Sequence, residues 1–256
     1  AAQAAAVAGT RLYRPHELDE LIAAGAHRRG RQAGAARRSR AALVVTGEKT
    51  QAAARRLVQE AGHDDLVVLN FASATRVGGG FLKGARAQEE DLARVSGLYR
   101  CLETQPEYYA RNREAASPLY TDHVIHSPAV PWFRDADLAL LAAPYLAAVI
   151  TAPAPNATRL LGRHAEPTRE LRETLRRRAG HVLTVAAAHG HRTLLLGAWG
   201  CGVFGNDPGL VADAWVTLLR GRRFAGCFDH VEFAVDDTTR EQRIVGAFRA
   251  RVPGGR

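Results

Sequence analysis

The run from Leu66 to Phe71, Leu-Val-Val-Leu-Asn-Phe, constrains the fold of this chain more than any other segment. Its apolar residues are nearly continuous rather than alternating, which is typical of a strand that is covered on both faces of a sheet. Helical patterns and further short apolar runs alternate along the chain on both sides of it. This alternation predicts an α/β fold, in which helices flank a sheet.

The patterns place the expected elements as follows. Strands are expected at residues 42–46, 66–71, 123–127, 147–151, 192–198 and 231–235. Helices are expected at residues 50–61, 88–102, 167–190 and 238–251, with another beginning at Asn206-Asp207-Pro208. Pro167 is expected near the first helical position.

The first forty residues carry a different pattern. Leu18, Leu21 and Ile22 lie at helical spacing, ahead of a basic stretch rich in Gly and Ala. We expect a helical extension over residues 1–41, followed by one domain over residues 42–256, because no Pro/Gly/Ser-rich linker divides the latter. The Ala-rich start, residues 1–9, lacks the charged beginning of a secretory signal and is expected to be frayed.

The composition restricts the function classes. The formal net charge is +9, and nearly all the basic residues are arginine, since the lysines are Lys49 and Lys83. This balance favours a polyanionic partner, but an arginine bias on a solvated surface explains it equally well. No stretch approaches the length of a membrane span. The cysteines, Cys101, Cys201 and Cys227, are widely spaced, which favours a cytoplasmic protein without structural disulfides or a zinc site.

A first candidate site follows the strand at 66–71. Seven residues separate Gly78-Gly79-Gly80 from Gln88-Glu89-Glu90, which begins a helix. Successive glycines let the backbone approach a ligand and turn amides toward an anion. A flexible turn and a charge complement to the helix N-terminus are the plain alternatives, and by themselves they explain the glycines and the glutamates. Neighbouring helical residues point about 100° apart, so Glu89 and Glu90 should have different roles.

A second candidate site is the glycine-rich segment 197–205, which follows a strand and precedes a capped helix. Phe204 offers a flat apolar face there, although a core position is the commoner reason for one Phe. Two glycine loops after strands suit a diphosphate held at the carboxyl edge of a sheet. Neither loop matches the dinucleotide-binding or nucleoside-triphosphate motifs.

These segments resemble the signature of the bacterial-type poly(ADP-ribose) glycohydrolases. The resemblance covers Asn70 to Ala74, the glycine triplet, the Gln88-Glu89-Glu90 triplet and the loop from Gly200 to Phe204, and extends over about residues 42–250. Arg76-Val77 before the glycines departs from the pattern. The resemblance implies a macrodomain-like mixed sheet in a three-layer α/β/α fold that cleaves terminal ribose–ribose bonds and releases ADP-ribose.

The resemblance also implies roles for individual residues. Glu90 is expected to protonate the leaving oxygen, a role that needs a protonated carboxylic acid, and Glu89 to orient the ribose. The expected ligand-binding residues are Asn70, Ser73, Gly78, Gly79, Gly80, Gln88, Gly200, Cys201, Gly202, Val203, Phe204 and Gly205. Asn70 and Ser73 could instead cap the strand end.

The implied partners are poly(ADP-ribose) or ADP-ribosylated proteins as substrate and ADP-ribose as product, for a monomer that acts in the DNA damage response. No cofactor or metal is expected. The histidines at 123, 126, 189 and 191 are interpreted as structural.

Two other functions compete with this interpretation. A macrodomain could bind ADP-ribose, or remove it or its acetyl group, without cleaving polymer, but the Gln88-Glu89-Glu90 triplet favours a positioned acid. A basic nucleic-acid-binding protein is less favoured, because only 7% of the residues are aromatic and they do not alternate with basic ones.

Overall fold

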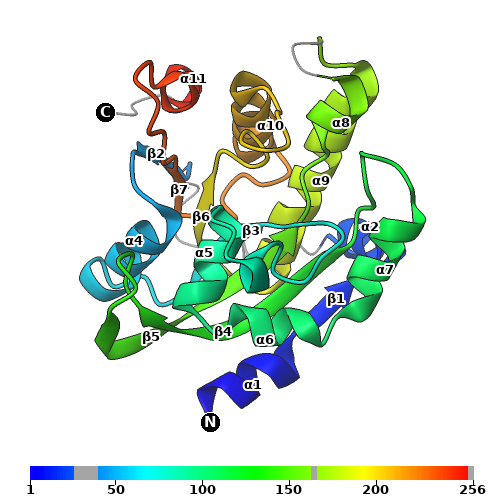
Figure 1. Ribbon diagram of the computed structural model, residues 1–256. Helices are drawn as coiled ribbons and strands as arrows, with labels where there is room; N and C mark the ends of the chain where they lie inside the picture. The colour runs from blue at the N-terminus through cyan, green and yellow to red at the C-terminus, as the bar shows by residue number, and fades with distance from the viewer. Residues whose placement is uncertain (26–39, 163–165, 253–256) are drawn as a thin grey trace.

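The computed structural model describes residues 1–25, 40–162 and 166–252. In these residues a seven-stranded sheet has the order β1-β4-β5-β3-β6-β7-β2 (Figure 1). Its strands are β1 (Arg11–Tyr13), β2 (Ala42–Thr46), β3 (Leu66–Phe71), β4 (Val124–Arg134), β5 (Leu140–Ala152), β6 (Thr193–Gly197) and β7 (His230–Ala234). The five strands from β5 to β2 are parallel to one another, and β4 is antiparallel to both β5 and β1. The expected mixed sheet is therefore confirmed.

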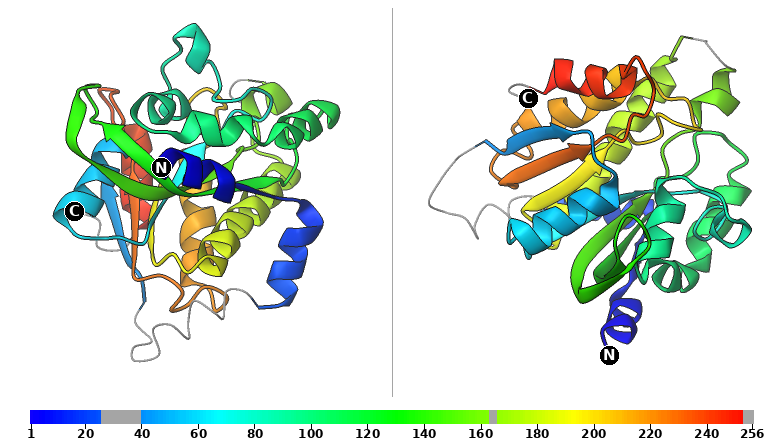
Figure 2. Two further views of the ribbon diagram at one scale, coloured as in Figure 1. Left: turned by 90° about the horizontal axis from the view of Figure 1, so that it is seen from below. Right: turned by 60° about the vertical axis from the view of Figure 1, so that its left-hand side comes forward.

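Helices cover both faces of this sheet (Figure 2). One face carries α2 (Pro15–Ala23), α8 (Ala157–Leu161), α9 (Arg169–Ala188), α10 (Pro208–Arg220) and α11 (Arg243–Arg251), whose buried side chains belong to one hydrophobic cluster. The other face carries α1 (Ala2–Gly9), α4 (Thr50–Arg55), α5 (Gln88–Val95), α6 (Leu98–Glu103) and α7 (Pro106–Glu114), which share a second cluster. The expected three-layer arrangement is confirmed.

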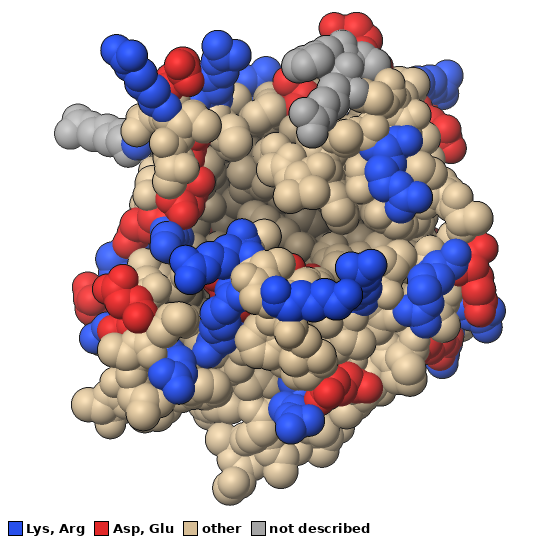
Figure 3. All heavy atoms as spheres, in the orientation of Figure 1, with Lys and Arg blue, Asp and Glu red and all other residues tan. Residues whose placement is uncertain are grey.

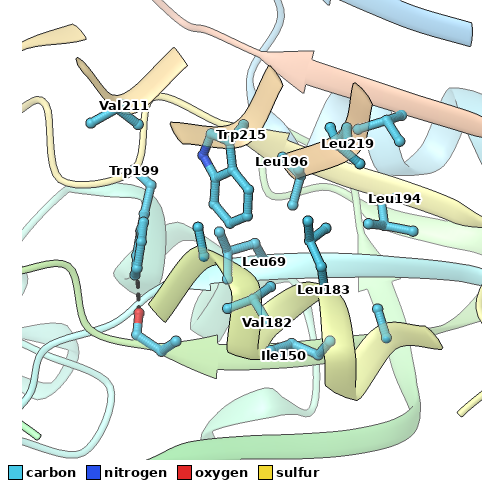
Figure 4. Packing of buried hydrophobic residues seen from close by; sticks show 14 of the residues in the cluster. Leu69, Ile150, Val182, Leu183, Leu194, Leu196, Trp199, Val211, Trp215 and Leu219 are labelled. Carbon is cyan, nitrogen blue, oxygen red and sulfur yellow. Dashed lines mark hydrogen bonds between the residues drawn. The ribbon is translucent and has the colours of Figure 1, made fainter. Parts of the chain in front are cut away.

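Strand β3 belongs to both clusters, as its continuous apolar sequence requires. Val67 and Leu69 lie in the first cluster, and Leu66 and Val68 lie in the second. In the first cluster the rings of Trp199 and Trp215 are 5.6 Å apart and pack beside Leu69 and Leu196 (Figure 4). Burying each such apolar side chain contributes about 1.5–3 kcal/mol to stability. The core therefore holds the carboxyl end of β3 in a fixed position.

The single helix expected over residues 88–102 is wrong, because the chain breaks between α5 and α6. Ser96 adopts an extended conformation with φ −140° and ψ 173°. It forms an isolated bridge with Trp132, and the N–H of Gly97 donates to the carbonyl of Pro131 at 2.9 Å. This pairing with β4 replaces the intrahelical bonds, so tertiary contacts override the helical pattern.

Other boundaries also shift. The segment 50–61 ends in a π-helix, Arg56–Glu60. Helix α9 begins at Arg169, because the Thr168 side chain caps it by accepting from the Leu171 N–H, which leaves Pro167 before the helix. Helix α11 begins only at Arg243, since the Asp237 side chain accepts from backbone N–H groups on both sides of a turn at residues 239–245.

The expected extension is partly integrated into the sheet. Ala2–Gly9 forms helix α1 rather than a frayed end: Ala6 is buried, and the Gln3 side chain donates to the Gly97 carbonyl at 3.0 Å. Strand β1 pairs with β4, which sequence analysis did not predict because three residues carry no periodicity. Residues 26–39 of the expected extension lie outside the described residues. None of the helices described here has the length and apolar character needed to cross a membrane.

Candidate active site

A cavity of about 440 Å³ opens at the carboxyl ends of β3, β5 and β6. On this face Figure 3 shows the molecule hollowed at its centre, with Lys and Arg side chains along the lower rim. The two candidate glycine loops form opposite walls. The lining residues include Ser73, Arg76, Gly79, Gly80, Gln88, Glu89, Glu90, Tyr120, Ala154, Gly200, Gly202, Val203 and Phe204. A volume of this size is typical of a site for a small organic ligand.

Groups on β3 and on the turn after it hold the Glu89 side chain in position. The Ser73 N–H donates to Glu89 Oε2 at 2.7 Å, and Asn70 Nδ2 donates to Glu89 Oε1 at 3.1 Å. Asn70 also donates to Thr151 on β5, and its Oδ1 atom has no partner among the described residues. Burial raises the pKa of Glu89 to about 8, against the opposing effect of the two hydrogen bonds. This side chain is therefore mostly a neutral carboxylic acid at pH 7.

The glycine triplet, by contrast, holds the Glu90 side chain in position. Its Oε1 atom accepts from the Gly80 N–H at 2.7 Å, and its side chain lines the cavity. Gly79 lies against both carboxylates: a Cβ at this position would overlap Glu90 Oε1 and lie 2.9 Å from Glu89 Oε2. Its φ of +62° also favours glycine. The two acids thus take their positions from different segments, and their expected difference in role stays a prediction.

The backbone amides distinguish the two glycine loops. The Gly79 N–H donates to the Arg76 carbonyl at 3.1 Å, and the Gly80 N–H donates to the Glu90 carboxylate. By contrast, the N–H groups of Gly200, Gly202, Val203 and Phe204 have no hydrogen-bond acceptor in the described part of the chain. Free amides at a cavity wall suit an anion. The second loop therefore has more amides available to an anion than Gly79 and Gly80 have, and a diphosphate contact of either loop stays a prediction.

Gln88 connects helix α5 to strand β3. Pairing of β3 with β6 ends at Val68 and Leu195, which leaves the next backbone groups of β3 without a strand partner on that side. The Gln88 side-chain amide donates to the Leu69 carbonyl and accepts from the Phe71 N–H, both at 2.8 Å. Gln88 lines the cavity, but its polar atoms are occupied in aligning the first turn of α5 with the strand end.

The second loop presents its residues to two sides. Gly202 and Val203 line the 440 Å³ cavity and also a neighbouring one of about 970 Å³, whereas Cys201 and Gly205 line only the latter. Burial raises the pKa of the Cys201 thiol, and a Cβ at Gly205 would meet Thr158 Oγ1. The structure therefore does not place Cys201 and Gly205 in the cavity that contains the two glutamates. Gly78 also lies behind the wall, against the ring of Tyr99.

Known proteins share this arrangement of fold and site. Residues 1–135 match the family model described as the microbial-type PARG catalytic domain, where PARG denotes poly(ADP-ribose) glycohydrolase. The enzyme from Thermomonospora curvata is 49% identical with a TM-score of 0.87, over 98% of this chain and 88% of that one. The chain belongs to the microbial-type poly(ADP-ribose) glycohydrolases. No curated protein sequence matches it.

Solved structures of this family include ligand complexes. The poly(ADP-ribose) glycohydrolase from Deinococcus radiodurans in complex with ADP-ribose is 48% identical with a TM-score of 0.88, over 98% of this chain and 97% of that one. The Thermomonospora curvata enzyme bound to the inhibitor ADP-HPD has a TM-score of 0.86 and the same coverage as its other structure. Membership therefore extends over nearly the whole chain.

The cavity of this glycohydrolase family member also contains residues that sequence reasoning missed. Tyr120 lines it with φ +59°, and its ring centroid lies 5.9 Å from that of Phe204. Phe204 thus packs on a neighbour and faces the cavity as well. The carbonyls of Leu119 and Tyr120 accept from the fully buried Arg178. No local pattern indicated this loop, because a residue on α9 positions it.

None of the described histidines lines this cavity, and His126, His189 and His191 form a cluster of their own. The rings of His126 and His189 stack at 3.7 Å, His126 Nε2 lies 3.0 Å from His191 Nε2, and Tyr13 bonds His189 at 2.7 Å. Burial lowers the pKa of His126 to about 2 and that of His189 to about 4. They are packing groups that stay neutral. The described residues contain no group of three or more His, Cys, Asp or Glu placed to hold a metal ion.

Proposed function

We propose that this chain hydrolyses the terminal ribose–ribose O-glycosidic bonds of poly(ADP-ribose) and releases ADP-ribose, with Glu90 as the general acid. One observation carries the assignment of the acid: two buried carboxylates, Glu89 and Glu90, lie side by side on one wall of a cavity whose other wall presents free backbone amides. A family member that binds ADP-ribose has the same fold.

Glu90 is suited to act on the leaving oxygen. Glycoside cleavage passes through an oxocarbenium-like state and needs a proton on the departing oxygen. Glu90 would donate that proton as the bond from the anomeric carbon to the oxygen breaks. A water molecule would then add to the anomeric carbon and return a proton to the Glu90 carboxylate. The hydrogen bond from Gly80 would stabilise the carboxylate between these two steps.

Glu89 is suited to orient the sugar. As a neutral acid at pH 7, it can both donate a hydrogen bond to a ribose hydroxyl and accept one. Its bonds to Ser73 and Asn70 fix its orientation relative to Glu90. The amides of the second loop would hold the diphosphate, and Phe204 with Tyr120 would cover the ligand. Such fixed placement of substrate accounts for much of an enzyme's rate enhancement.

The cellular setting is part of the same proposal. None of the three cysteines forms a disulfide, in agreement with a reducing compartment such as the cytoplasm. We infer a monomer there that acts on polymer formed in the DNA damage response. Detection of the chain in a cell fraction, together with polymer levels after DNA damage in cells with and without it, would test both inferences.

The activity is tested by incubating the purified chain with poly(ADP-ribose) and separating ADP-ribose from oligomers by chromatography over time. We expect ADP-ribose from the first time point, and the same rate after treatment with a chelator. Early accumulation of oligomers would instead indicate internal cleavage. No release of ADP-ribose from the polymer would contradict the proposed function.

A further inference from the structure

Cations lie on both sides of the glycine triplet in the sequence and along one rim of the cavity. Arg76 lines the cavity, and Lys83 and Arg86 are exposed next to the lining residues Gly80 and Ala87. None of the three cations forms an ion pair with an acidic side chain in the described ranges, although nearby Arg94, Arg100 and Arg111 each do. We call Arg76, Lys83 and Arg86 the basic rim. Figure 3 shows Lys and Arg side chains along the lower edge of the hollow.

The basic rim is carried by an ordered segment. The Gly80 carbonyl accepts from the N–H groups of both Lys83, at 2.9 Å, and Ala85, at 3.2 Å. The Phe81 ring packs on Tyr99 at 5.1 Å, and the Arg94 guanidinium lies over the Phe81 ring and donates to the Ala85 carbonyl. Lys83 and Arg86 therefore extend from a fixed backbone, which lowers the entropy cost of binding a ligand.

The position of Glu90 determines which part of a polymer reaches this rim. Glu90 is bonded to the Gly80 N–H, at the start of the segment that carries Lys83. An acid at this position protonates the leaving oxygen, so the unit attached to that oxygen departs past Gly80. The free amides for the retained diphosphate lie on the opposite wall, in the second loop.

From this arrangement we infer that the basic rim binds the diphosphate of the leaving ADP-ribose unit, the one next to the scissile bond in the polymer. The inference rests on the proposed function. The leaving unit carries a diphosphate within reach of its linkage oxygen, and Lys and Arg bind phosphate oxygens through charge-assisted hydrogen bonds. Unpaired cations at the rim lose no ion pair when they do so.

The double variant Lys83→Gln/Arg86→Gln tests this inference, and Arg176→Gln/Arg249→Gln is its control. The control removes two exposed arginines on α9 and α11 that form no ion pair in the described part of the chain. Two substrates are compared: the polymer, and ADP-ribose linked through the same bond to a leaving nucleoside from which the phosphates have been removed. Affinity for ADP-ribose is measured by calorimetry.

The rim variant is expected to lose about fivefold to tenfold in kcat/KM on the polymer at low salt, the scale of two exposed ion pairs. Its logarithmic salt slope should fall by roughly 1 per phosphate contact removed. Hydrolysis of the phosphate-free substrate and affinity for ADP-ribose should match wild type. Equal losses on both substrates, no loss on the polymer, or an equal loss in the control would overturn the inference and leave the proposed function intact. A wild-type chain inactive on both substrates would overturn both.

Discussion

The Glu90 carboxylate accepts a hydrogen bond of 2.7 Å from the backbone N–H of Gly80. A side chain from the first turn of α5 is therefore fixed by the loop that precedes the helix. Gly79, next to Gly80, leaves room for Glu90 and Glu89 together. The glycine triplet consequently places the two carboxylates, and in the proposed function the second loop would receive the diphosphate.

Glu90→Gln is expected to lower polymer hydrolysis by about 10² to 10⁴ while retaining affinity for ADP-ribose. The substitution is nearly isosteric and its Oε1 atom can still accept from Gly80, so only the transferable proton is lost. Rates of ADP-ribose release and calorimetric affinity are measured on the same preparations. Glu60→Gln, at an exposed carboxylate outside the cavity, is the control. Near-normal turnover by Glu90→Gln would show that another group supplies the proton.

Glu89→Gln is expected to change how stability depends on pH. The folded-state pKa of Glu89, about 8, lies above the value of 4.5 in an unfolded chain. The folded protein therefore binds more protons between these values, and wild type loses stability as the pH rises from about 4.5 to 8. The variant cannot ionise, so its stability relative to wild type should increase over this window by about several kcal/mol. Denaturant unfolding at pH 5 and pH 8.5 measures the difference, and a constant difference would contradict the raised pKa.

The sequence predicted the segments of this site better than their surroundings. Strand β3 has the expected bounds, Leu66–Phe71, because burial on both faces leaves a local signal in every residue. Glu89, Glu90 and Phe204 were located by different signals, the glycine spacing and the family resemblance. The break at Ser96 and the placement of Tyr120 depend on partners more than thirty residues away, Trp132 and Arg178. Local periodicity does not contain such contacts.

Gly79→Ala separates the placement of the acids from backbone strain. A side chain at φ +62° costs about 1–2 kcal/mol whatever surrounds it. Here the new Cβ would also displace Glu90 Oε1. We expect a loss of more than tenfold in kcat, since a displacement of the acid on this scale is costly. Gly62→Ala, at φ +73° with no neighbour within 4 Å, carries the strain alone. If both variants kept full activity, the fit of Gly79 between the acids would be irrelevant to catalysis.

Gly202→Val tests the second loop as the diphosphate site. A Cβ at Gly202 would meet no protein atom within 4 Å, and this residue lines the cavity, so the new side chain would extend into space that the ligand needs. The backbone at Gly202 does not have a positive φ. We therefore expect the free energy of unfolding to stay within about 0.5 kcal/mol of wild type. Affinity for ADP-ribose should fall at least tenfold by calorimetry, because a branched side chain would separate the free amides from the phosphate oxygens. Gly246→Val, on an exposed face of α11 with no neighbour within 4 Å, is the matched control. If a folded Gly202→Val protein kept its affinity for ADP-ribose, the diphosphate would bind elsewhere. The first glycine loop, Gly78–Gly80, would then be the candidate diphosphate site.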